Sequence, residues 1–187
     1  VLILPLIGVG TLAEATAPYG NPLVFLFLGG FLLAAAVEHH GLHRRIAGFV
    51  LTRAGASPRR LVAGFLLTSG FLSMWISNTA TVVLLLPVAL SVLQGPAAHR
   101  ALSVPVLLAV AYGASIGGTA TLIGTPPNAM TAAWLAQTQG IEIGFGRWAA
   151  LAMPFVLLFL ALGWRVLVHR LPSGEAGGRI ALPGMVM

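Results

Sequence analysis

The stretch "SMWISNTATVVLLLPVAL" (residues 73–90) places a polar cluster inside one of the most apolar parts of the chain. No charged residue occurs from Leu61 to Ala98, yet hydroxyl and amide side chains interrupt this region at Ser77, Asn78, Thr79 and Thr81. In a lipid bilayer each unsatisfied polar group costs several kcal/mol. The cluster therefore needs a structural or functional reason.

The composition of the whole chain indicates an integral membrane protein. Hydrophobic residues make up 58% of it and charged residues 7%, whereas roughly a quarter of the residues of a soluble domain are charged. A membrane span needs only about 20 apolar residues, and four segments lack Asp, Glu, Lys and Arg: Ala15–Val37, Leu61–Ala98, Ala101–Ile141 and Trp148–Trp164. We therefore predict an all-α, polytopic membrane protein and not an enzyme.

The net charge of +6 does not indicate a nucleic-acid partner, because the arginines separate hydrophobic runs instead of gathering on a polar surface. If the chain turns back at Ser77, one side of the membrane holds Arg44, Arg45, Arg53, Arg59, Arg60, Arg100, Arg165, Arg170 and Arg179. Arg147 alone lies opposite, with Glu14 and Glu142. The positive-inside rule then predicts that the arginine-rich side faces the cytoplasm of the plasma (inner) membrane.

Five regions are expected along the chain. They are scaffold spans with an interfacial amphipathic helix (1–58), a re-entrant hairpin (59–94), a broken transmembrane helix (95–146), a final span (147–170) and a loop-like tail (171–187). Within the first region we expect a partial span from Val1 to Leu12, a polar turn, and a span from Pro22 to Val37. The chain starts inside an apolar run without Met, so we expect a truncated start and no signal peptide.

The hairpin is predicted from the length of its limbs. Each side of the Ser77 cluster has roughly 15 apolar residues, about 22 Å of helix, against a hydrocarbon core of about 30 Å. Two limbs this short favour a re-entrant hairpin over two full spans. The charge pattern is the same for both arrangements.

The segment "SIGGTATLIGTPPN" (residues 115–128) predicts a second interruption. Two prolines cannot continue a helix that begins upstream, and the glycines loosen the segment. We therefore expect two half-helices with an unwound middle, as in many secondary transporters that bind sodium and anions near the membrane midplane.

The two interruptions predict complementary binding chemistry. Ser77, Asn78 and Thr79 are suited to cap the second hairpin limb, and a helix start attracts anions. We expect a second such tip where Thr125, Pro126 and Pro127 precede a half-helix. The chain has no Asp, Lys or Cys, so a cation must be held by neutral oxygens. A cation and an anion bound together make each other's binding less costly.

Other interpretations of these polar residues are structural or concern other ligands. The hydroxyls and glycines of either interruption can serve helix packing alone. The glycine-rich segment lacks the Lys of a P-loop. His39, His40 and His43 form a solvated basic face more readily than a metal site, because Glu38 is the only carboxylate near them.

The sequence resembles the divalent anion:sodium symporter family at "SNTAT" (residues 77–81) and "SIGGTATLIGTPPN" (residues 115–128). Members of this family carry dicarboxylates, citrate or sulfate. Arsenite permeases and sodium/proton antiporters are similar there, but typically have an acidic residue in place of Thr125 and lack the upstream Ser-Asn-Thr. The resemblance covers most of the chain, but only one of the family's two inverted repeats.

The resemblance implies roles for matching residues. Asn78, Thr79 and Thr119 would bind substrate, and Ser73, Ser77, Asn78, Gly118 and Gly124 would supply oxygens to a sodium ion. It also implies a homodimer with an elevator motion and a further half, absent here, that completes the site. The expected function is sodium-driven uptake of a C4-dicarboxylate or citrate. The alternatives are a sodium-independent exchanger, a sulfate carrier or a non-transporting membrane scaffold.

Overall fold

The computed structural model describes residues 3, 8, 10–20, 22–41, 45, 48, 57–93, 100–169 and 171. In this part of the chain every regular element is a helix, which agrees with the predicted all-α class. The elements are α2 (Leu12–Thr16), the 3-10 helix η1 (Ala17–Gly20), α3 (Pro22–His39), α5 (Pro58–Ser73), α6 (Asn78–Leu93), α7 (Arg100–Gly118), α8 (Pro126–Gln139) and α9 (Phe145–Val168).

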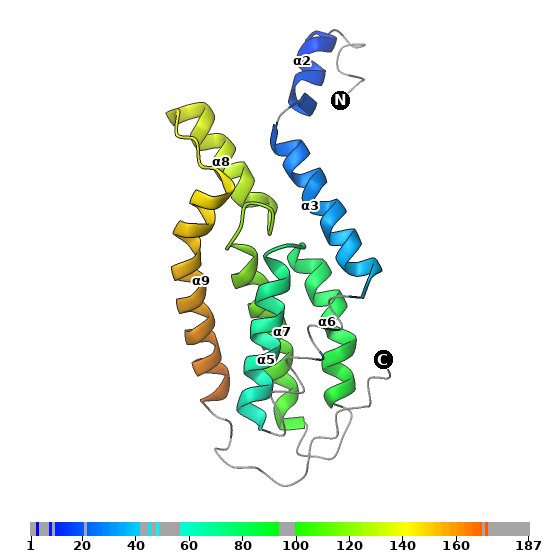
Figure 1. Ribbon diagram of the computed structural model, residues 1–187, viewed down its shortest axis with the longest axis vertical. Coiled ribbons are helices and arrows are strands. Elements are labelled where there is room, and N and C mark those ends of the chain that lie inside the picture. Colours follow the sequence, from blue (N-terminus) through cyan, green and yellow to red (C-terminus); the bar gives the residue numbers. More distant parts are fainter. Residues whose placement is uncertain are drawn as a thin grey trace.

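Four of these helices form the packed body of the molecule. α5, α6 and α7 lie side by side and α9 packs along α5 and α7, while α3 and α8 extend beyond them (Figure 1). Phe65 of α5, Leu85 of α6, Val110 of α7 and Val156 of α9 are all almost fully buried in one hydrophobic core. This body positions the two polar interruptions.

The closest helix contact joins α5 to α7. The Ser69 hydroxyl donates to the Val110 carbonyl oxygen over 2.6 Å. A Cβ atom on Gly113 would lie 2.5 Å from the Leu66 carbonyl oxygen, and one on Gly117 would overlap the backbone of Gly70. Small residues allow helix backbones to approach this closely, so α5 and α7 form a tightly packed pair.

The two helices of the predicted hairpin are short, and its re-entrant course stays a prediction. α5 and α6 have 16 residues each, or about 24 Å at 1.5 Å per residue. α9 has 24 residues, or about 36 Å. Among the described residues α9 is the one helix long and apolar enough to cross a membrane. Figure 1 shows the tip of the α5–α6 hairpin at the level where α7 gives way to α8.

The predicted interruption of the second segment is confirmed as a structural break. α7 ends at Gly118 and α8 begins at Pro126. The two prolines occupy the first two positions of α8, where their missing N–H groups cost nothing. α8 ends at Gly140, whose φ of 65° is the left-handed conformation that favours glycine at a helix end.

The N-terminal part differs in one respect from the expectation. The segment expected to span the membrane from Pro22 is helical, as α3, and its crossing of the membrane stays a prediction. The short helix α2 occupies part of the expected polar turn. The Thr11 hydroxyl accepts the Glu14 N–H, and the Glu14 carboxylate accepts the Thr11 N–H, which makes a capping box. The bonds from the Thr11 backbone and side chain lower the pKa of Glu14.

Two expectations for the first region fall largely outside the described residues. They are the partial span over residues 1–12 and the interfacial helix. Of the expected interfacial helix the structure describes Arg45 and Gly48, and both are helical.

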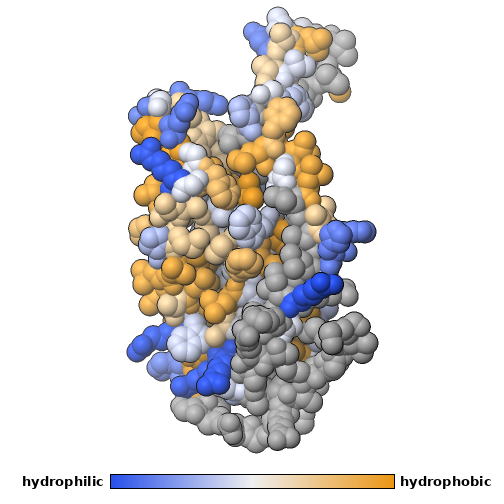
Figure 2. All heavy atoms as spheres, in the orientation of Figure 1, coloured by the Kyte–Doolittle hydropathy of each residue, from blue (hydrophilic) through white to orange (hydrophobic). Residues whose placement is uncertain are grey.

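Polar and apolar residues separate along the body as expected for a chain in a membrane. Figure 2 shows hydrophobic residues over the middle of the side where α9 lies, with hydrophilic ones above and below. Large apolar side chains of α9 are exposed there, among them Phe155 and Phe159. Arg147 lies near the start of α9 and Arg165 near its end, about 27 Å apart along the helix.

Candidate functional site

The hairpin tip is organised by its own side chains. The chain turns between α5 and α6 over four residues, Met74 to Ser77. The Ser77 hydroxyl accepts the Ala80 N–H at 3.2 Å, so Ser77 caps α6 as predicted. The Ser73 hydroxyl donates to Asn78 Oδ1 over 2.7 Å. Ser73 and Asn78 therefore tie the end of one limb to the start of the other.

The break between α7 and α8 is organised mainly through its backbone carbonyls. The buried Asn128 amide nitrogen donates to the Gly118 carbonyl oxygen at 2.8 Å and to the Thr121 carbonyl oxygen at 2.7 Å. The Thr121 hydroxyl accepts the Gly124 N–H at 3.1 Å. These bonds hold an irregular backbone segment in one conformation.

The hairpin tip and the break touch each other. The Thr121 hydroxyl donates to the Met74 carbonyl oxygen over 2.5 Å. A Cβ atom on Gly118 would overlap Asn78 Oδ1 and lie 3.2 Å from Ser73 Oγ, and one on Gly124 would lie 2.8 Å from the Ser73 carbonyl oxygen. A side chain at Gly118 would displace the Asn78 amide, and one at Gly124 would press on backbone atoms, so glycine lets the two segments approach this closely.

These contacts gather most of the residues assigned to sodium from the sequence. Ser73, Asn78, Gly118 and Gly124 lie against one another, and Ser77 caps the helix that Asn78 begins. The cluster offers neutral oxygens only. Hydroxyl, amide and carbonyl oxygens each have a second lone pair beyond the bonds described here, so they retain acceptor capacity for a hard cation.

The residues assigned to substrate are more open. Thr79 and Thr119 are exposed, one on α6 and one just after α7. The Thr119 hydroxyl donates to the Ile116 carbonyl oxygen over 2.7 Å. In the part of the chain that the structure describes, neither threonine hydrogen-bonds to the Ser73–Asn78 pair. Thr81, also in the motif, is buried in α6, and its hydroxyl has no hydrogen-bond partner among the described residues.

The two helix starts differ in what they offer an anion. At α6, the N–H groups of Asn78 and Thr79 have no acceptor among the described residues, as expected for the first turn of a helix. At α8, Pro126 and Pro127 have no N–H, and Asn128 donates its N–H to the Thr125 carbonyl oxygen at 3.1 Å. The expectation of a second anion-binding tip at Thr125 is therefore wrong, because the prolines remove the donors.

Three contributing residues were not identified from the sequence: Thr121, Asn128 and Trp148. The Trp148 indole N–H donates to the Thr119 carbonyl oxygen at 3.1 Å. One signal existed for Asn128, since the chain has three asparagines and two of them, Asn78 and Asn128, lie in the quoted motifs. Nothing local marks Trp148, because its partner is 29 residues away in the chain.

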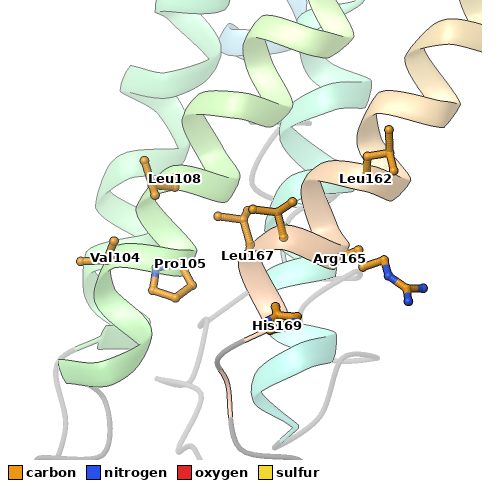
Figure 3. A pocket seen from close by; sticks show the side chains of 8 residues that line it. Val104, Pro105, Leu108, Leu162, Arg165, Leu167 and His169 are labelled. Atoms are coloured by element: carbon orange, nitrogen blue, oxygen red, sulfur yellow. The ribbon is translucent and has the colours of Figure 1, made fainter.

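A cavity of about 590 Å³ lies at the other end of α7 and is distinct from this site. It is mostly apolar, and Figure 3 shows the Arg165 guanidinium pointing away from the other labelled side chains. Its lining residues are Val104, Pro105, Leu108, Leu162, Arg165, Val166, Leu167 and His169. It holds none of the residues that join the hairpin tip to the break.

Comparison with known proteins identifies the family. A family model described as "Citrate transporter" matches residues 1–179. The sodium-dependent dicarboxylate transporter SdcS of Staphylococcus aureus (strain USA300) is 36% identical over 174 residues, which cover 88% of this chain and 34% of that protein. The same protein from strain NCTC 8325 / PS 47 gives the same figures. The chain spans about a third of the length of these relatives.

A model match over nearly the whole chain, together with this identity, shows the family. The chain belongs to the citrate transporter family and, within it, resembles the N-terminal half of a divalent anion:sodium symporter, so its family is one of integral membrane transporters and not of enzymes.

Proposed function

We propose that this chain is part of a sodium-coupled symporter that takes up a divalent organic anion, a C4-dicarboxylate or citrate. The observation that supports this most is the contact between the hairpin tip and the break at Gly118 and Asn78. Two polar interruptions far apart in sequence supply complementary chemistry at one place. The relatives' description as sodium-dependent dicarboxylate transporters points the same way.

The proposed sodium site is the cluster of neutral oxygens between the two interruptions. Ser73, Ser77 and Asn78 supply oxygens from the hairpin tip, and the backbone of Gly118 and Gly124 supplies them from the break. Hard cations such as sodium prefer oxygen ligands, and irregular backbone at a helix break is a common source of them. No Arg, Lys or His lies in either interruption, so sodium would bring the only full positive charge.

The proposed anion site is the start of α6. Asn78 and Thr79 present backbone N–H groups there, and their side chains add an amide and a hydroxyl. The positive end of the helix dipole attracts a carboxylate without any cationic side chain. Thr119, exposed at the edge of the break, would add a further hydroxyl.

Coupling follows from the absence of fixed charge. A carboxylate beside bound sodium gains a favourable Coulomb interaction that neither ion has alone. Each ion therefore raises the affinity of the protein for the other by the same factor. This reciprocity is the physical basis of symport in the proposal.

The remaining features of the proposal concern the complete transporter. The hairpin is re-entrant and opens toward the cytoplasm, which agrees with Arg59 at the start of α5 and Arg165 at the end of α9 lying at one end of the body. A second repeat completes the substrate site. The protein works as a homodimer by an elevator motion of the hairpin and the broken helix against the scaffold spans.

The test is uptake by proteoliposomes that contain the full-length protein with these residues. Wild type should accumulate a C4-dicarboxylate when a sodium gradient is applied, and Asn78→Ala should insert normally but lose this uptake. Uptake that ignores the sodium gradient would indicate an exchanger, and preference for sulfate would indicate a sulfate carrier. Normal sodium-driven uptake by Asn78→Ala would contradict the site, and no transport of any of these anions would favour a scaffold.

A further inference from the structure

The first turns of α9 contact both polar interruptions. The Phe145 ring packs against the Trp75 ring of the hairpin tip, with centroids 6.5 Å apart. The Trp148 indole N–H donates to the Thr119 carbonyl oxygen of the break at 3.1 Å. Residues three apart share a face of a helix, so a single face of α9 reaches the tip through Phe145 and the break through Trp148.

Trp148 supplies a bond that the break cannot make for itself. The last carbonyl groups of a helix lack partners within that helix, and Thr119 directly follows the end of α7. The Thr119 N–H and hydroxyl both donate to the Ile116 carbonyl oxygen, at 3.2 Å and 2.7 Å. The Thr119 carbonyl oxygen instead accepts from α9, which fixes the peptide plane after Thr119 from outside the break.

We propose that Trp148 is a positioning residue for the sodium and anion site. Trp148 is not among the residues proposed to bind either ion. It holds Thr119, whose hydroxyl belongs to the proposed anion site. Because Gly118 directly precedes Thr119, the same bond also holds the backbone that abuts Asn78. The affinity for both ions then depends on an indole N–H in a separate helix. This inference rests on the proposed function of the same site.

The chain offers a matched control at the other end of α9. The Trp164 indole N–H donates to the Arg59 carbonyl oxygen, also at 3.1 Å. Trp164 lies 16 residues further along the helix, about 24 Å away. Replacing a tryptophan by Phe removes the N–H and part of the ring system. Both changes are the same in Trp148→Phe and Trp164→Phe, so the two variants differ mainly in which backbone carbonyl loses its donor.

The experiment compares the two variants in the full-length protein. The half-saturating sodium concentration is measured from sodium-dependent thermal stabilisation, and KM and kcat are measured from dicarboxylate uptake. Trp148→Phe should raise the sodium half-saturation and KM by about fivefold, the effect of losing one ordinary hydrogen bond, and change kcat much less. Trp164→Phe should lower the melting temperature without changing either half-saturation value.

Equal sodium half-saturation and KM in wild type and Trp148→Phe would overturn the role of Trp148 while leaving the proposed function intact. The same shift in both variants would also overturn it, because the effect would then be structural. Absence of any sodium response in wild type would overturn the proposed function, and this inference with it.

A measurement on the unmutated site covers the case in which Trp148→Phe does not fold. In wild type labelled with fluorotryptophan, the Trp148 fluorine resonance should shift with sodium at the same half-saturation, and the Trp164 resonance should not. A Trp148 resonance that ignores sodium would overturn the inference.

Discussion

The hairpin tip and the α7–α8 break are both polar interruptions of apolar helices, yet they are built in opposite ways. At the tip, side chains bond to one another and to the next helix: Ser73 to Asn78, and Ser77 to the Ala80 N–H. At the break, the backbone carbonyls are held by side chains from elsewhere, Asn128 of α8 and Trp148 of α9. The two side-chain bonds of the tip are made within the hairpin, whereas the carbonyl oxygens of the break accept bonds from α8 and α9.

This difference gives each interruption a separate chemical task. The start of α6 keeps free backbone N–H groups, which would suit an anion, whereas two prolines remove them from the start of α8. The break instead concentrates carbonyl oxygens, which suit a cation. In the proposed function, a neutral site binds ions of both signs because donors and acceptors come from different segments, and each segment can be disturbed separately.

The largest effect is expected at the contact of α5 with α7, the two helices that lead into the tip and the break. Gly117→Ala places a Cβ atom on the Gly70 backbone, which no side-chain rotation relieves. We expect a loss of about 3 kcal/mol of stability or a failure to fold, seen as a lower melting temperature and poor recovery after detergent extraction. Gly146→Ala is the matched control, because its Cβ atom meets nothing within 4 Å. Equal stability of the two variants would contradict the described contact.

The next largest effect should be confined to the break. Asn128→Ala removes the donor to two carbonyl oxygens, those of Gly118 and Thr121. Leaving buried acceptors unsatisfied costs about 1–3 kcal/mol, and the sodium half-saturation should rise because the Gly118 carbonyl is no longer held. Thr138→Ala is the control in the same helix, since its exposed hydroxyl bonds, among the described residues, to the Trp134 carbonyl oxygen one turn back in α8. A variant at Asn128 with unchanged stability and sodium response would show that the break holds itself.

The sequence predicted the elements of the site better than their support. Both interruptions and the cap at Ser77 could be located from local signals. These signals are polar residues in apolar runs, the lengths of the helices and the Pro126–Pro127 pair. The roles of Trp148 and Thr121 depend on partners 29 and 47 residues away, and local spacing says nothing about such contacts. The capping box at Thr11 has a local signal, the Glu three residues later. This signal predicts a helix start where a polar turn was expected.

The smallest effect on stability is expected at the two helix caps. Ser77→Ala removes a side-chain bond to the Ala80 N–H and should cost about 1 kcal/mol of stability. Thr125 occupies the same position before α8, but its hydroxyl makes no capping bond, so Thr125→Ala should change stability by no more than about 0.5 kcal/mol. Thermal unfolding of both variants is measured without sodium, so that the loss of stability is separated from any effect on ion binding. A larger loss at Thr125 would reverse the contrast between tip and break.

The most direct measurement compares the binding of radioactive sodium to purified full-length wild type and to the Gly118→Ala variant, which adds one methyl group. This methyl group would overlap Asn78 Oδ1, at the point where the hairpin tip and the break meet. Wild type and Gly146→Ala should bind sodium saturably, more tightly when a C4-dicarboxylate is present, and Gly118→Ala should fold but lose this binding. Sodium binding by Gly118→Ala at wild-type affinity would show that the two interruptions do not share a sodium site.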